Sequence, residues 1–236
     1  MSVVNPNTKG DSETVNQGEV VPVTSHSSPR ATSPLNGTFD YEGHVYRDAK
    51  GNRVPSVTQI LKRTGLVSYE QVQADILENR RNLGEIVHRD TQELDTGEIS
   101  FSPTRKDAQP YVNAWKKFLR ECDVRILAIE WAEVVAYNAM PFGMTFDRLA
   151  VVNGREAVLE IKTSSVKEAW WGVQTAAYDI GLGQCASQLY RDRYVVQLRD
   201  DETYRLWKYS EESDYWAFQF ALSLCWWMLN KGYSLE

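Results

Sequence analysis

Cysteines and long apolar runs are scarce in this chain, and each scarcity excludes a class of protein. The 236 residues include three cysteines, Cys122, Cys185 and Cys225, which lie far apart without paired spacing. That spacing argues against a zinc or four-cysteine cluster site and indicates a reducing compartment. No apolar run approaches the roughly 18 residues that a membrane-spanning helix needs. We therefore expect a cytoplasmic protein with no membrane partner.

Basic residues are outnumbered by acidic ones, and the net charge is −6. An acidic chain is at first sight a poor partner for nucleic acid, but binding depends on local rather than global charge. Basic pairs recur along the chain, at Lys62-Arg63, Arg80-Arg81, Arg105-Lys106 and Lys116-Lys117. Each pair is either part of a local binding surface or ordinary solvated surface.

Residues 1–36 lack both the apolar stretch of a signal peptide and the Arg-rich pattern of a transit peptide. Their Ser, Thr, Asn and Pro content predicts a disordered leader. In the whole chain 42% of residues are hydrophobic, including eight Trp and twelve Tyr, which is enough to bury a core. We expect a single domain over residues 37–236.

Periodicity along that domain alternates between helix and strand patterns. We expect a hairpin over 38–47, a short helix entered at Ser56 as N-cap, and helices over 69–94 and 108–122. A strand should cover 125–137, a hairpin 146–162, a helix 167–180 closed by Gly181 as C-cap, strands 190–198 and 203–209, and a last helix 213–230. This order predicts a mixed α/β domain.

Asn153-Gly154 is the most informative dipeptide, because it predicts a two-residue type I′ hairpin between two apolar runs. Counting outward from that turn places Asp147 opposite Glu160, and Lys162 two residues further on the same face. Two carboxylates and an amine would then share one patch of the sheet. Facing like charges destabilise a ladder, so a divalent cation is the natural compensation.

The wider constellation resembles a known family. Gly84-x-x-x-His88, Asp147, Glu160-x-Lys162 and Gln174-x-x-x-Tyr178 are similar to the motif series of RecB-type nucleases in the PD-(D/E)XK superfamily, close to its phage exonucleases. The run from Pro55 to Leu61 is similar to a leader motif of single-strand exonucleases in this group. One departure is Phe146, where the superfamily pattern has Pro. The resemblance implies a restriction-endonuclease-like core, with a mixed central β-sheet flanked by helices.

The resemblance also implies a role for each matching residue. Mg²⁺ or Mn²⁺ would be held by His88, Asp147, Glu160 and the backbone carbonyl of Ile161, with Asp147, Glu160 and Lys162 as the catalytic set. Substrate phosphate would be contacted, or the site ordered, by Gln174 and Tyr178. Either Glu130 or Glu133 would add a further acid. Ordinary packing is the alternative for Gln174 and Tyr178, and a structural histidine is the alternative for His88.

We therefore expect a divalent-metal-dependent deoxyribonuclease, an exonuclease that acts in DNA recombination, repair or replication in a bacterial or phage-infected cell. Its partner would be DNA with a free end or a single strand, together with a recombination or single-strand-binding protein. Two alternatives belong to other classes. One is a non-catalytic DNA-binding or assembly module that retains the nuclease fold, and the other is an aromatic-rich carbohydrate-binding domain.

Overall fold

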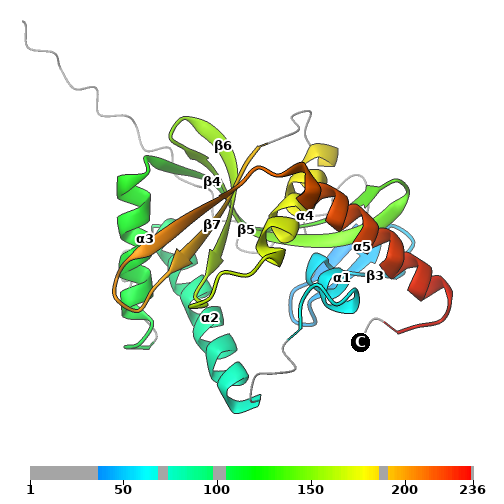
Figure 1. Cartoon of the computed structure of the whole chain (residues 1–236), viewed down its shortest axis with the longest axis horizontal. Helices are drawn as coiled ribbons and strands as arrows, with labels where there is room; N and C mark the ends of the chain where they lie inside the picture. The colour runs from blue at the N-terminus through cyan, green and yellow to red at the C-terminus, as the bar shows by residue number, and fades with distance from the viewer. Residues whose placement is uncertain (1–36, 69–73, 98–104, 186–190, 235–236) are drawn as a thin grey trace, which may run out of the picture.

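The computed structural model describes residues 37–68, 74–97, 105–185 and 191–234 (Figure 1). The leader expected over residues 1–36 lies outside the described residues. The strands are β1 Gly37–Asp40, β2 Val45–Asp48, β3 Arg53–Val54, β4 Val124–Tyr137, β5 Met140–Val152, β6 Arg155–Lys162, β7 Asp192–Leu198 and β8 Tyr204–Tyr209. The helices are α1 Val57–Arg63, α2 Ala74–Asp95, α3 Gln109–Glu121, α4 Trp170–Cys185 and α5 Glu212–Asn230.

A five-stranded sheet in the order β4-β5-β6-β7-β8 forms the centre of the molecule. Strands β4, β5 and β6 pair antiparallel, β6 and β7 pair parallel through the α4 crossover, and β8 returns antiparallel. A smaller sheet, β1-β2-β3, packs beside it. The expected α/β class, with a mixed central sheet flanked by helices, is confirmed.

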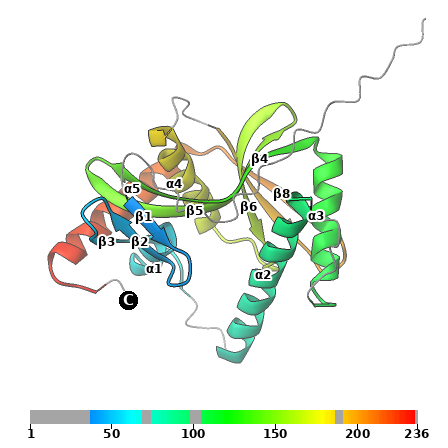
Figure 2. The ribbon, with the colours of Figure 1, turned by 180° about the vertical axis from the view of Figure 1, so that it is seen from behind.

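Helices cover the two faces of this sheet, as Figures 1 and 2 show from opposite sides. Alternate residues of β6 face opposite ways, as the period of a strand requires. Leu159 and Ile161 pack with Trp115 and Phe118 on the α2 and α3 side. Val158 packs on the other side with residues of α4 and α5, such as Tyr178 and Phe218. The even-numbered Glu160 and Lys162 therefore belong to the α4 side of the strand.

The turn at Asn153-Gly154 has the geometry that its sequence predicts. Asn153 and Gly154 have positive φ angles of 48° and 79°, which a type I′ hairpin requires at both central residues. Val152 pairs with Arg155, and the register continues outward to Arg148 opposite Leu159. The predicted register of this hairpin is confirmed over these pairs.

The entry into α1 is also as predicted, because Ser56 caps the helix. The Ser56 hydroxyl accepts from the Gln59 backbone N–H at 3.2 Å, and the Gln59 side chain accepts from the Ser56 N–H at 3.0 Å. This reciprocal capping box satisfies two N–H groups at the helix start.

The predicted end of the fourth helix is wrong, because α4 continues through Gly181 to Cys185. A Cβ at Gly181 would lie 2.3 Å from the Met144 sulfur on β5. The glycine therefore permits close packing of helix on sheet, and does not end the helix. The helix predicted from residue 69 is described from Ala74, since residues 69–73 lie outside the described ranges.

Membrane-spanning helices are absent from the part of the chain that the structure describes, since none of its helices combines the necessary length and apolar character.

Candidate active site

The candidate site lies where β5 and β6 stop pairing. Their ladder ends at Arg148 opposite Leu159, one step before Asp147 and Glu160. The Asp147 carboxylate then accepts a hydrogen bond from the backbone N–H of Ile161 at 2.6 Å. The sequence predicted that Asp147 lies directly opposite Glu160 in the ladder, and that prediction is wrong. The strands have separated, and a side chain fills the place of the next backbone hydrogen bond.

His88 reaches Asp147 from α2, on one face of the sheet. Its Nδ1 lies 3.2 Å from Asp147 Oδ1 and 3.9 Å from Glu130 Oε1. One ligand atom from each of these three residues lies within 4.8 Å of the others, a grouping that could hold a metal ion.

Glu130, and not Glu133, is the acid that β4 contributes beside His88. Glu130 has a positive φ of 46°, which is uncommon for a non-glycine residue. Glu133 is buried, and its Oε2 accepts from the Trp131 indole N–H at 3.2 Å.

Glu160 is surrounded by polar groups from β6 and α4. The Lys162 ammonium donates to Glu160 Oε1 at 2.7 Å, and the Gln174 amide donates to the same oxygen at 2.9 Å. The Gln174 amide also lies 2.8 Å from the Tyr178 hydroxyl. The structure thus brings these four residues together on the α4 side. The position of the Ile161 carbonyl relative to a cation stays a prediction.

Two buried acceptors at the site lack a hydrogen-bond partner among the described residues, Glu160 Oε2 and Gln174 Oε1. Buried acceptors are normally paired, so an unpaired carboxylate oxygen next to a second carboxylate is a place where a cation would bind. Carboxylate oxygens suit Mg²⁺ or Mn²⁺, and an added imidazole suits Mn²⁺. The residues present therefore fit a hard divalent cation.

The pKa values of the two buried carboxyl groups of the site are shifted in opposite directions. Burial raises the pKa of Glu160 to about 7, and the Asp147 charge adds to that shift. Burial also acts to raise the pKa of Asp147, but the His88 charge and its hydrogen bond outweigh it and lower that pKa. Burial lowers the pKa of His88, yet Asp147 and Glu130 outweigh it and raise the value to about 10. Metal binding here would therefore release protons.

Arg148 is a site-supporting residue that the motif analysis missed. Its buried guanidinium donates to Asp95 at 2.6 Å, to the Asp147 carbonyl at 2.7 Å and to Thr91 at 3.3 Å. It also lies 3.4 Å from Glu130 Oε1. These bonds tie α2 to β4 and β5, and so set the position of His88. The spacing of His88, Thr91 and Asp95 on one helical face is the sequence signal that could have revealed it.

Gly84, one turn before His88, is not required for close packing of helix on sheet. A Cβ there would lie 3.6 Å from the Thr163 hydroxyl oxygen, an ordinary contact.

Trp171 is buried in the core, while Trp170 is half-buried with the Lys162 ammonium 5.0 Å from its ring centroid. Among the basic pairs, Arg81 forms an exposed ion pair with Glu85 at 3.5 Å.

No family model and no curated protein sequence matches this chain. Among solved structures, one named "Putative exonuclease" from Eubacterium rectale is 10% identical, with a TM-score of 0.46, over 72% of this chain and 77% of that one. A second, the protein SSO0001, is 12% identical with a TM-score of 0.32, over 71% of this chain and 82% of that one. At these values neither likeness bears on the chemistry, which is inferred from the site itself.

Proposed function

We propose that this protein is a divalent-metal-dependent deoxyribonuclease that acts as an exonuclease in DNA recombination, repair or replication. One observation carries the proposal. Where β5 and β6 separate, ligand atoms of His88, Glu130 and Asp147 lie close enough to hold one metal ion. Glu160, bonded to Lys162 on the next strand, keeps one buried oxygen without a partner among the described residues. A DNA-binding surface has no need of buried carboxylates beside a lysine, whereas a metal ion that hydrolyses a phosphodiester needs carboxylate ligands.

His88, Glu130 and Asp147 would hold Mg²⁺ or Mn²⁺, with Glu160 and the Ile161 carbonyl as further ligands. Such a cation supplies a bound water of lowered pKa and positive charge for the phosphate oxygens. Lys162, held at 2.7 Å by Glu160, would orient the attacking water and stabilise charge on the phosphate.

Gln174 and Tyr178 are better suited to ordering the site than to touching substrate. Tyr178 is 3% exposed, and the Gln174 amide is shared between that hydroxyl and Glu160. We propose that this pair fixes the Glu160 carboxylate from the α4 side.

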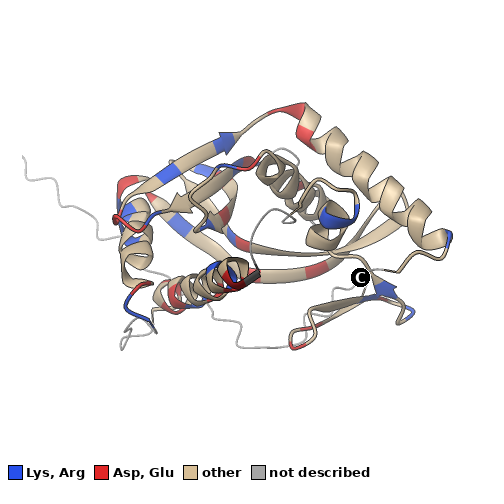
Figure 3. Ribbon diagram, turned by 60° about the horizontal axis from the view of Figure 1, so that its bottom comes forward, with Lys and Arg blue, Asp and Glu red and all other residues tan. Residues whose placement is uncertain are grey.

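Carbohydrate binding would need exposed aromatic side chains in a row, and α5 has such a row. Trp216, Phe220 and Trp227 are each more than half exposed along it. After Asp214 the helix carries no charged residue, and it is tan over most of its length in Figure 3. Carbohydrate binding gives no reason for the buried carboxylates of Asp147 and Glu160, so the nuclease proposal is the better supported.

The test is degradation of end-labelled single- and double-stranded DNA with Mn²⁺ or Mg²⁺. We expect the wild-type protein to degrade DNA and Lys162→Ala to be at least about a hundredfold slower. Lys208→Ala is a matched control, because Lys208 also bonds a carboxylate on this sheet, Asp192 at 3.0 Å. Asp192 lies opposite Ala157 of β6. Ala157 is five residues before Lys162, which is about 16 Å along the strand, so the control lysine lies away from the candidate site.

Equal rates for wild type and Lys162→Ala would remove this lysine from the mechanism. Absence of degradation on every substrate would favour the alternative of a non-catalytic DNA-binding module. A comparison of linear with covalently closed circular DNA separates exonuclease from endonuclease action, and we expect the circle to be resistant.

A further inference from the structure

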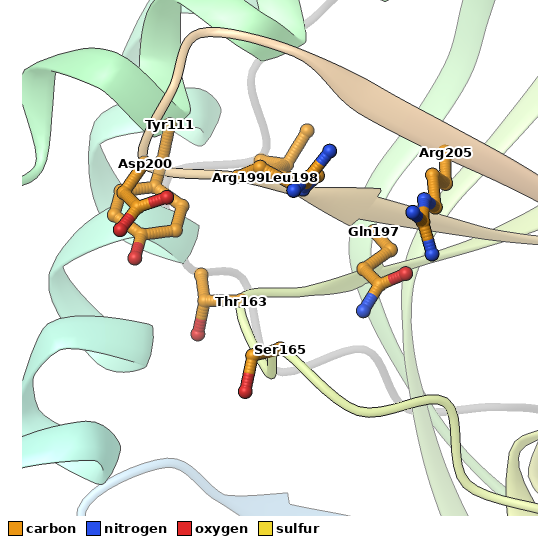
Figure 4. A pocket seen from close by; sticks show the side chains of 8 residues that line it. All are labelled: Tyr111, Thr163, Ser165, Gln197, Leu198, Arg199, Asp200 and Arg205. Carbon is orange, nitrogen blue, oxygen red and sulfur yellow. The ribbon is translucent and has the colours of Figure 1, made fainter.

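A cavity of about 160 Å³ opens beside the candidate site, at the carboxyl ends of the parallel strands β6 and β7. In open α/β sheets this edge is where ligands bind. Figure 4 shows Thr163 and Ser165 on the segment after β6, Arg199 and Asp200 after β7, Arg205 on β8 and Tyr111 on α3. None of these residues has a role in the chemistry proposed above.

Several hydrogen-bond donors of this cavity are unused. Within the described ranges, the Arg205 guanidinium and the hydroxyls of Thr163 and Ser165 have no hydrogen-bond or ion-pair partner. Gln197, by contrast, is committed, because it donates to the Ser164 carbonyl at 2.6 Å and accepts from Trp207 at 3.0 Å. The Gln197 amide in the lining is therefore held in place, whereas the donors of Arg205, Thr163 and Ser165 are available to a ligand.

Charge and size together indicate what this cavity binds. Arg199 and Arg205 outnumber the one carboxylate in the lining, Asp200, although Arg199 also pairs with Asp201 at 3.4 Å. Guanidinium and hydroxyl donors are the usual partners of phosphate oxygens. At about 160 Å³ the cavity is smaller than the roughly 300 Å³ at which pockets for whole organic ligands begin. It suits a phosphate group with water better than a complete nucleotide.

The cavity begins where the candidate active site ends. Thr163 directly follows Lys162, and its hydroxyl lies beneath Gly84, one turn before His88 on α2. A strand held for hydrolysis at Lys162 would therefore pass this cavity with a neighbouring phosphate.

We propose that this cavity is a phosphate-binding subsite that holds a DNA phosphate next to the one that is cut, with Arg205 as its main contact. The identity of the polymer as DNA rests on the proposed function. The phosphate is either an internal linkage or the terminal 5′-phosphate, and the two sources are separated by the choice of oligonucleotide.

The experiment measures dissociation constants for single-stranded oligonucleotides that carry one uncharged methylphosphonate linkage at successive positions, with either a 5′-phosphate or a 5′-hydroxyl. The protein is Lys162→Ala with Mg²⁺, so that the strand stays intact, with and without Arg205→Ala. Arg125→Ala is the matched control, because Arg125 is an exposed arginine on β4, the opposite edge strand. Cleavage by the wild-type protein is assayed separately.

We expect Arg205→Ala to weaken binding about fivefold to tenfold and to lower the slope of log affinity against log salt by about 1, with Arg125→Ala unchanged. One methylphosphonate position should weaken binding only while Arg205 is present, which couples that linkage to the arginine. Coupling to the 5′-phosphate alone would identify the terminal group as the occupant.

Equal effects of Arg205→Ala and Arg125→Ala, with no coupled linkage, would overturn the subsite and leave the nuclease proposal standing. Coupling without any cleavage by the wild-type protein would support the subsite and overturn the nuclease proposal. Failure to bind any oligonucleotide would overturn both.

Discussion

Asp147 and Arg148 are neighbours on β5, yet they belong to two buried ionic groups of opposite character. The side chains of Arg148 and Asp95 are each at most 1% exposed. Burial raises the pKa of Asp95 too, but contacts with Thr91, Trp115 and the Asp147 carbonyl give both charged groups hydrogen-bond partners. The group around Asp147 and Glu160 leaves a buried carboxylate oxygen without a partner among the described residues and raises the pKa of Glu160.

The difference separates a structural ion pair from a binding site. A buried pair is tolerated when its geometry and extra hydrogen bonds offset the cost of desolvation. A buried carboxylate with an oxygen that lacks a partner is destabilising by itself and persists where a ligand supplies that partner. The first group should therefore respond to mutation, and the second to pH and to metal.

Arg148→Met should give the largest loss of stability. It leaves the Asp95 carboxylate buried without its partner, which costs about 3–5 kcal/mol. Urea unfolding measures this loss, and the exposed Arg125→Met should stay within about 0.5 kcal/mol of wild type. A loss below about 1 kcal/mol for Arg148→Met would show that Asp95 is protonated or hydrated, and that the two groups do not differ as described.

The metal-free protein should lose stability as pH rises from 5 to 7. The pKa of Glu160 is about 7 in the folded protein, above its ordinary value, so the folded state holds this proton longer than the unfolded chain. Stability falls where the folded state binds more protons, by on the order of 3 kcal/mol in total. His88 acts in the same direction above its ordinary pKa, because its folded pKa is about 10.

Unfolding in chelator at pH 5, 6 and 7 measures this fall. Glu160→Gln should flatten the curve, because it removes the carboxyl that titrates. A wild-type curve that is flat, or that rises with pH in this window, would contradict the assignment of Glu160.

Saturating Mn²⁺ should reverse that loss, by about 2.7 kcal/mol at a hundredfold excess over the dissociation constant. The gain should be larger at pH 8 than at pH 6, since the ligands must lose protons. Thermal melts with and without metal measure it. Asp147→Asn should abolish the rise in melting temperature, while the exposed Asp201→Asn should keep it. An equal rise in melting temperature in both variants would show that the metal binds elsewhere in the protein.

Local sequence predicted the parts of the site that a turn or a helical repeat determines. The Asn153-Gly154 turn fixed the pairs up to Arg148 and Leu159, and Ser56 marked the start of α1. The place where the ladder ends could not be read from the sequence, because it depends on the bond between Asp147 and Ile161. No local pattern shows where two strands part.

One wrong prediction and one open alternative have the same origin in contacts between distant residues. A glycine near the end of an apolar helix is the normal signal for its end, and only the contact with Met144 shows that Gly181 lies inside α4. Glu130 and Glu133 were equal candidates by sequence, and the positive φ of Glu130 together with its nearness to Arg148 and His88 distinguishes them.

Lys208→Ala should have the smallest effect, and it sharpens the comparison for a single residue type. Lys208 is 49% exposed, and its partner Asp192 keeps Arg155 at 3.2 Å and the Tyr194 hydroxyl at 3.2 Å. Loss of such a surface pair costs less than about 0.5 kcal/mol. Lys162, which is 18% exposed, is the one cation bonded to Glu160 among the described residues. Urea midpoints and melts with metal should therefore leave Lys208→Ala close to wild type, and a larger change than for Lys162→Ala would reverse this ranking of the two lysines.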